Sequence, residues 1–345
     1  MTALVPKDYQ YPGEKAVFLQ AMGGIWALFL ILAGILLWST FNGRSVLYHR
    51  HQAWIIMLLY PAITVLALNY FSARPRKAEL KKAGPRARVS PSNELQLHKL
   101  MKDASTLLCM KQPELYVIQD EVPFLYAVPG RQGSIIMSNK CIEVLRPEEL
   151  AAAIAKQLGH LKSGHVTADL AITAIRRANP LLQVLFLPAT LMSILMRGWQ
   201  DMIDYTADRC SLLVTRRLQT CTASMVKLAA VGVTITKVGA KDKKRQEKRK
   251  QRAGEPVTDR EMAADEAEKV LAEVAPEELD AYLAGGGELT DDPIQVERAF
   301  KISRFIEQQR NLKDRIRNLG EWGETDQCEA ALAKVDEIRG TLKSA

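Results

Sequence analysis

The sequence predicts an α+β fold that is predominantly α-helical, with two N-terminal transmembrane helices and one small β-sheet. Two apolar stretches near the N-terminus approach the length of about 20 residues that a membrane-spanning helix needs. Two short segments between residues 114 and 138 are rich in Val, Ile and Tyr, which favours strands. Much of the remaining chain of 345 residues follows helical periodicity.

Residues 1–73 are predicted to form a transmembrane hairpin, with spans at about 16–38 and 54–71. The first span is interrupted by a single polar side chain, Gln20. Trp54 flanks the second span, as aromatic residues do at membrane interfaces. A buried helical hairpin in a soluble protein is the alternative, but we see no other part of the chain that would cover two such apolar segments.

A basic juxtamembrane linker, residues 74–91, sets the predicted orientation. It carries seven Lys or Arg residues against the single acid Glu79, whereas the loop between the two spans carries only Arg44 and Arg50. Cytoplasmic loops of membrane proteins are enriched in basic residues. The chain is therefore expected to be an integral membrane protein with its bulk and its N-terminus in the cytoplasm. The cluster can also bind anionic lipid headgroups, although a topology signal is sufficient to explain it.

Composition excludes some functional classes. The 47 basic and 39 acidic residues give a net charge of +8, which suits an anionic membrane surface, and no nucleic-acid motif accompanies it. The five cysteines are odd in number and have no Cys-x-x-Cys spacing, which argues against both a disulfide framework and a cysteine zinc site. These cysteines are Cys109, Cys141, Cys210, Cys221 and Cys328.

The middle of the chain begins with a predicted helix from about Ser92 or Asn93, either of which can cap it, to Lys111. Segments 114–119 and 133–138 are predicted strands, separated by turns that Pro and Gly residues mark. Pro147 is expected to open the next helix at its first position, where its missing N–H costs nothing.

That helix contains the most informative stretch, residues 155–160, with the sequence Ala-Lys-Gln-Leu-Gly-His. Zinc peptidases use His-Glu-x-x-His on a helix, where two His side chains four apart grip the ion and Glu is the general base. Here Lys156 stands where the first His would be, Gln157 where the Glu would be, and His160 remains.

Four segments in the same order resemble the HtpX-like membrane zinc metallopeptidases, relatives of the CAAX prenyl proteases. Residues 149–165 resemble their active-site helix, and Asp204-Tyr-Thr-Ala-Asp208 their Glu-x-x-Ala-Asp helix. Residues 123–127 resemble the substrate-cleft segment Asn-Ala-Phe-Ala. Asp292-Pro293-Ile294 with Arg298 resembles the His-Pro…Arg element. The likeness covers roughly residues 90–310 and implies a zincin-like fold.

The resemblance also implies roles for single positions. The three ligand positions hold Lys156, His160 and Asp204, the position that orients the first ligand holds Asp208, and the general base is replaced by Gln157. Asp292 and Arg298 fall at the cleft element. An ammonium repels a divalent cation and an amide cannot accept a proton near neutrality, so we expect no catalytic residue, no metal and no cofactor.

The positive charge of Lys156 can compensate for the missing zinc ion. Without zinc, Asp204 and Asp208 would face each other in a cleft at an electrostatic cost. We therefore expect the Lys156 ammonium to replace the ion and to bridge the two carboxylates. His165, five residues after His160, is expected to be a helix-end or surface histidine rather than a ligand, and His160 a hydrogen-bonded core histidine.

Composition and motif positions predict how the chain is divided into domains after the juxtamembrane linker. Residues 92–240 and 290–320 are assigned to the metallopeptidase-like domain, 241–289 to a charged insertion and 321–345 to a C-terminal helix. The apolar run 181–196, broken by Pro188, is short for a full span. A re-entrant or membrane-lying segment is favoured, with a helical hairpin inside the domain as the alternative.

These patterns support three functional hypotheses. The first is a membrane-anchored pseudo-metallopeptidase that acts as a scaffold, adaptor or regulatory subunit of a membrane complex, with an extended client peptide as a further partner in its cleft. The second is an active membrane zinc endopeptidase with a non-standard site built from His160, Asp204 and either His165 or Asp292. The third is a plain membrane-surface anchor that acts through its basic clusters.

Overall fold

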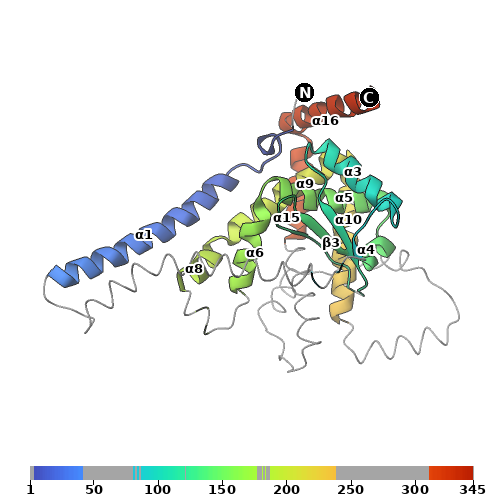
Figure 1. Cartoon of the computed structure of the whole chain (residues 1–345). Coiled ribbons are helices and arrows are strands. Elements are labelled where there is room, and N and C mark those ends of the chain that lie inside the picture. The colour runs from blue at the N-terminus through green and yellow to red at the C-terminus, as the bar shows by residue number, and fades with distance from the viewer. Residues whose placement is uncertain are drawn as a thin grey trace. The chain divides into compact units, whose positions relative to one another are not determined.

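The computed structural model describes residues 4–41, 81, 84, 87–120, 122–176, 181, 183, 187–237 and 311–344. Helices dominate and three short strands form one sheet (Figure 1). The elements are η1 (Pro6–Asp8), α1 (Glu14–Phe41), α3 (Leu95–Leu107), β1 (Glu114–Ile118), β2 (Leu125–Val128), β3 (Ser134–Ser138), α4 (Asn139–Val144), α5 (Pro147–Lys162), α6 (His165–Arg176), α8 (Leu187–Leu195), α9 (Arg197–Thr215), α10 (Leu218–Lys237), α15 (Leu312–Gly323) and α16 (Asp326–Ser344).

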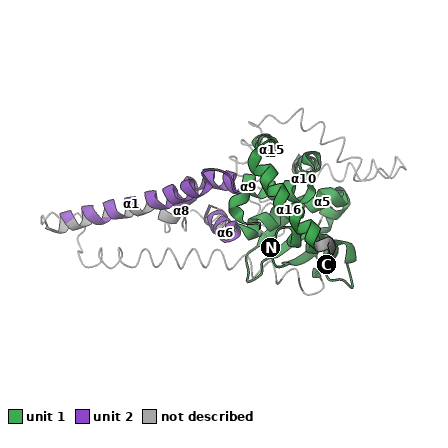
Figure 2. Ribbon diagram, turned by 90° about the horizontal axis from the view of Figure 1, so that it is seen from above, with its two compact units in different colours: residues 1–9, 83–163, 205–345 green, residues 10–82, 164–204 purple. Residues whose placement is uncertain are grey.

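The chain divides into two compact units (Figure 2). Unit 1 comprises Met1–Tyr9, Ala83–Ser163 and Tyr205–Ala345, and it contains the sheet and the motif helix α5. Unit 2 comprises Gln10–Lys82 and Gly164–Asp204. Each unit is built from segments that are distant in the sequence, so long-range packing defines both.

The sheet of unit 1 has the strand order β1-β3-β2. Strand β3 pairs in parallel with β1 and antiparallel with β2. The outer edge of β1 is met by the segment before α3, where the Val89 amide donates to the Leu115 carbonyl at 2.8 Å. Strand β2 forms the other edge and packs against α5.

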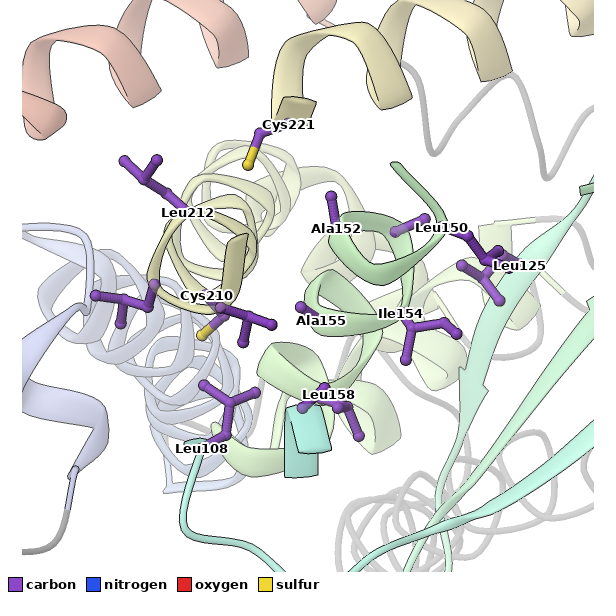
Figure 3. Packing of buried hydrophobic residues seen from close by; sticks show 14 of the residues in the cluster. Leu108, Leu125, Leu150, Ala152, Ile154, Ala155, Leu158, Cys210, Leu212 and Cys221 are labelled. Carbon is purple, nitrogen blue, oxygen red and sulfur yellow. The ribbon is translucent and has the colours of Figure 1, made fainter. Parts of the chain in front are cut away.

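A single large core surrounds α5 in unit 1. Ala155 of α5 faces Cys210 of α9, and Leu150 faces Leu125 of β2 (Figure 3). Small residues on one side of α5 and branched residues on the other let the helix fit between a neighbouring helix and the sheet. The helix that carries the motif is therefore held from several sides.

Unit 2 has its own smaller core, centred on Trp199. Phe18 of α1 packs on Trp199 with ring centroids 5.3 Å apart, and Met196 is fully buried in the same cluster. A Glu14 carboxylate oxygen lies 2.8 Å from His165 Nε2, and both side chains are buried. The first turns of α1 are thus covered by protein.

Several sequence predictions are confirmed. Strands β1 and β3 match the predicted segments, α5 begins at Pro147, and α16 occupies most of the predicted C-terminal helix. One prediction is wrong in detail: neither Ser92 nor Asn93 caps α3, whose N-cap is Glu94 without a side-chain bond. Asn93 instead accepts the Ser90 amide at 2.7 Å and closes the preceding turn.

The first predicted membrane span coincides with a helix, since residues 16–38 form part of α1. Within the described part of the chain, however, no helix meets the combined length and hydropathy that crossing a membrane requires. Val17, Phe18, Ala21 and Met22 of α1 contribute to the core of unit 2 instead. The second predicted span, 54–71, and the charged insertion 241–289 lie outside the described residues.

Candidate functional site

The position of α5 is fixed at its first turn. Pro147 occupies the first helical position, and Glu149 Oε2 accepts the Arg146 amide at 2.8 Å. Both carboxylate oxygens of Glu149 also accept from Lys227 Nζ of α10, at 2.7 and 2.9 Å. This buried ion pair ties α5 to α10 and sets which face of α5 looks into the core.

The crossing of α5 and α9 depends on a glycine. A Cβ atom at Gly159 would lie 2.8 Å from Cys210 Sγ and 3.2 Å from the Ala207 backbone. Only a residue without a side chain allows this approach. The close crossing brings the Lys156 turn of α5 next to the Asp208 turn of α9.

Asp208 is the centre of the site, with 1% of its side chain exposed. Arg315 of α15 grips it with two hydrogen bonds, from Nε to Oδ2 at 2.7 Å and from NH2 to Oδ1 at 2.8 Å. The guanidinium is itself 2% exposed. A bidentate, charge-assisted pair of this kind is strong and geometrically specific. Lys156 Nζ lies 3.6 Å from Oδ1 of the same carboxylate.

Gln157, at the general-base position, has a structural role. Its side-chain Oε1 accepts the backbone N–H of Ala127 in β2 at 3.0 Å. The residues on either side of Ala127 in β2 are the ones that direct their amides towards β3, because amides alternate in direction along a strand. The Gln157 amide group therefore occupies a hydrogen-bond position on the open edge of β2.

The space above these residues is small. A cavity of about 30 Å³ lies between β2, α5, α9, α10 and α15. By the same measure one water molecule needs about 10–15 Å³, so the cavity holds about two waters. Its lining includes the site residues Lys156, Gln157, Asp208 and Arg315 together with Ser211 and Ser224.

The other residues that the sequence predicted for the site differ in burial and in the unit to which they belong. His160 is partly buried, and its role as a hydrogen-bonded core histidine stays a prediction. His165 begins α6, as a helix-end histidine should, but it is buried against Glu14 rather than on the surface. Asp204 precedes Asp208 by one turn of α9 but belongs to unit 2, and the Lys156 bridge to it stays a prediction. Asp292 and Arg298 lie outside the described residues.

The side chains at this seat do not fit a zinc ion. Zinc requires thiolate, neutral imidazole or carboxylate ligands, whereas the first ligand position holds the Lys156 ammonium, which lies 3.6 Å from the Asp208 carboxylate. Among the described residues, no three His, Cys, Asp or Glu side chains gather in a way that could hold a metal ion.

Arg315 is the functional residue that the sequence analysis missed. The sequence analysis assigned the arginine of the His-Pro…Arg element to Arg298, because Arg298 follows the dipeptide Asp292-Pro293. A signal was nevertheless present: Arg315 lies three residues after Leu312 and four before Leu319, on the apolar face of its helix. A charge inside an apolar stripe must find a buried partner, and Asp208 is that partner.

Comparison with known proteins gives a consistent result. A family model described as Peptidase family M48 matches residues 91–305. The chain is 32% identical over 155 residues to a protein named plastoglobule-localized metallopeptidase 48, chloroplastic, from Arabidopsis thaliana. The aligned part is 44% of this chain and 44% of that relative, so the chain spans less than half of the relative's length. No solved structure matches the chain.

Proposed function

The chain belongs to peptidase family M48, and from that membership we propose that it is a degenerate, HtpX-like member that acts without hydrolysing peptides. Its function is that of a membrane-associated scaffold, adaptor or regulatory subunit. The relative's printed name describes that protein as a metallopeptidase. This chain keeps the fold framework and replaces the groups that would perform the reaction.

The observation that carries the proposal is the double cation at Asp208. Arg315 and Lys156 place two positive charges within hydrogen-bond or ion-pair distance of one buried carboxylate. A divalent cation entering this seat would be repelled by both, and at 4 Å two unit charges interact by about 4 kcal/mol at an effective dielectric constant of 20. The seat thus favours a metal-free, folded framework.

Membrane association is supported by exposed apolar side chains on α1. Leu19 is 67% exposed and Trp38 is 64% exposed, with Leu30, Ile31 and Ile35 similarly open. Exposed apolar residues in such number favour contact with lipid or with another membrane protein. The basic linker at 74–91 supplies the complementary charge for anionic headgroups.

A client segment in the cleft would have to compete with Gln157. Strand addition uses the free N–H and C=O groups of an edge strand, and Gln157 already accepts the Ala127 amide. A client bound at β2 therefore displaces this side chain or pairs with the rest of the edge. In either case the client meets an amide, and not a carboxylate, at position 157.

The proposal is tested by isolating the tagged full chain from its native membrane in mild detergent and identifying its companions by quantitative mass spectrometry. Gln157→Ala serves as the matched variant, because it removes the side chain at the family's base position while leaving Asp208 and Arg315 in place. We expect the same companions, in intact form, with both proteins. Client fragments that accumulate with the natural chain and disappear with Gln157→Ala would show that the chain is an active peptidase.

A further inference from the structure

The cavity of unit 1 offers hydrogen-bond donors to whatever fills it. Because Gln157 Oε1 accepts the Ala127 amide, the two N–H groups at the tip of that side chain can donate into the cavity that Gln157 lines. Ser224, 3% exposed, lines the same cavity, and its hydroxyl can donate there as well. The Ser211 hydroxyl differs, because it already donates to the Ala152 carbonyl at 2.7 Å.

The charges around the cavity favour a negative occupant. Of the described side chains that line it, the charged ones are Lys156, Arg315 and Asp208. Arg315 neutralises Asp208 through two hydrogen bonds, at 2.7 and 2.8 Å. Lys156 Nζ lies 3.6 Å from the same carboxylate, which is too far for a hydrogen bond. Burial raises the pKa of the Cys221 thiol to about 12, so this lining residue is neutral near pH 7. The lining therefore carries one more positive charge than negative charge.

The size of the cavity suits a carboxylate group. Its volume of about 30 Å³ corresponds to about two waters, and the two oxygens of a carboxylate can take their places. Part of the wall is apolar and includes Leu125 and Ala152 (Figure 3), which suits the carbon chain that carries the group. The side chain of Lys156 is 12% exposed, so a single side chain or a chain end can reach the ammonium.

Other classes of ligand fit this cavity less well. A metal cation has the same sign of charge as Lys156 and Arg315. A phosphate group, with its tetrahedral set of oxygens, needs more room than two waters do. A neutral peptide carbonyl can accept from the same donors, but it brings no charge to balance Lys156, and a partly buried charge is costly without such balance.

We infer that this cavity binds a carboxylate group of an extended client segment, with Lys156 as the counter-ion and Gln157 and Ser224 as hydrogen-bond donors. The client lies along the open edge of β2, next to Gln157, and the carboxylate reaches the cavity from that edge. An acidic side chain and a free C-terminus supply the same group. This inference rests on the proposed binding of clients without hydrolysis, and it adds that the client is acidic at one defined position.

The inference is tested by selecting random peptides of about ten residues, the length of a long strand, on the purified full chain in mild detergent. One library has a free C-terminal carboxylate and the other a C-terminal amide. An acidic side chain as the ligand should enrich Asp or Glu at one position in both libraries. A chain end as the ligand should retain only peptides of the first library. Failure to retain any peptide, or retention without either preference, would overturn the inference.

A retained peptide is then compared with the same peptide in which the acid is replaced by its amide, using fluorescence anisotropy. With the natural chain we expect the amide peptide to bind about tenfold more weakly, because a charge-assisted hydrogen bond is lost. Lys156→Gln should reduce this difference to about twofold or less. The control Lys140→Gln removes an ammonium that pairs with Glu143 elsewhere in unit 1, and it should leave the difference unchanged. An equal difference in the natural chain and in Lys156→Gln would overturn the inference.

Hydrogen exchange of the β3 amides reports whether each variant is folded. If Lys156→Gln is not folded, Ser224→Ala replaces it, and we expect this variant to weaken binding of the acidic peptide by about fivefold, as the loss of one hydrogen bond does. Ser224→Ala with unchanged affinity would then count against the inference.

Mass spectrometry of the bound peptides separates this inference from the proposed function. We expect the peptides to remain intact. Acid-dependent binding followed by cleavage would overturn the proposed function and leave the inference in place. Intact peptides that bind without any preference for a carboxylate would overturn the inference alone.

Discussion

At the scale of single residues, Arg315 holds the Asp208 carboxylate in position through two hydrogen bonds. Both side chains are almost fully buried, so removing one charge leaves the other buried with less compensation. Asp208→Asn keeps the shape and removes the charge, so we expect it to lower the free energy of unfolding by about 3–5 kcal/mol. Urea unfolding in mild detergent measures this loss.

Glu148→Gln is the matched control for that measurement. Glu148 pairs with Arg217 at 3.3 Å, but both side chains are about 70% exposed. Exposed pairs contribute about 0–1 kcal/mol, so this variant should unfold nearly as the natural chain does. Equal losses in the two variants would show that burial does not set the cost of removing the Asp208 charge.

The buried thiols predict how stability depends on pH. Burial raises the pKa values of Cys141, Cys210 and Cys221 from 9.0 to about 12. Between pH 9 and 12 these thiols lose their protons in the unfolded chain and keep them in the folded one. Stability is therefore fully present below pH 9 and falls as the pH rises towards 12, by about 1.4 kcal/mol per pH unit for each thiol.

Urea midpoints measured from pH 8 upwards check this dependence. Other groups titrate in the same range, so the natural chain is compared with Cys210→Ala, which removes one of the three thiols. We expect the fall in stability above pH 9 to be smaller in the variant. Parallel pH profiles for the two proteins would show that Cys210 ionises as readily in the folded chain as in the unfolded one.

At the scale of elements, the crossing of α5 and α9 depends on Gly159. Gly159→Ala would place a methyl group 2.8 Å from Cys210 Sγ, and we expect a loss of about 1–3 kcal/mol because the two helices must separate. Gly198→Ala in α9, where no atom lies within 4 Å of the new Cβ, is the control and should be neutral or slightly stabilising. Thermal or urea unfolding compares the two, and a harmless Gly159→Ala would mean that the helices can separate at little cost.

The edge of β2 gives a second prediction at this scale. Gln157→Ala removes the acceptor of the Ala127 amide and should accelerate hydrogen exchange there by about fivefold, equivalent to one hydrogen bond of about 1 kcal/mol. Gln157→Glu retains an acceptor oxygen and should preserve the protection. Unchanged exchange in Gln157→Ala would show that another group closes this edge.

The same elements show what the sequence could predict. Strands β1 and β3 were predicted because their segments are rich in Val, Ile and Tyr and are separated by turn residues. The start of α5 was predicted because Pro147 precedes two acids. Strand β2 was missed because Pro123 and Pro129 suggested a turn. Those prolines flank Leu125–Val128 without interrupting it, and a four-residue strand exists only through its pairing with β3.

Long-range partners were harder to predict than elements. The family motif pointed to Lys156 as the charge next to Asp208, and Lys156 does lie 3.6 Å away. The stronger partner, Arg315, comes from a helix 107 residues further along the chain. The burial of Leu4 and Tyr9 in the core of unit 1 was not predicted, because two isolated residues carry no periodic pattern and the rest of that core lies far along the chain.

At the scale of the whole molecule, the chain belongs to family M48 and carries Lys156, Gln157 and Asp204 at positions where the resemblance implies two zinc ligands and the general base. The packing of α5 against β2, α9 and α10 does not require a metal, because Glu149–Lys227, Asp208–Arg315 and Gln157–Ala127 each join α5 or α9 to a neighbour. We propose that such a framework remains folded and can bind partners. We propose that the Lys156 and Arg315 cations stand where a metal ion is bound in metal-dependent relatives.

Elemental analysis of the purified full chain, expressed with zinc in the medium and washed without chelator, tests this claim most directly. We expect far less than one zinc per chain, and the same low value for His160→Ala. A restored variant that combines Lys156→His, Gln157→Glu and Asp204→Glu should retain more zinc than the natural chain. About one zinc per natural chain that is lost in His160→Ala would contradict the claim.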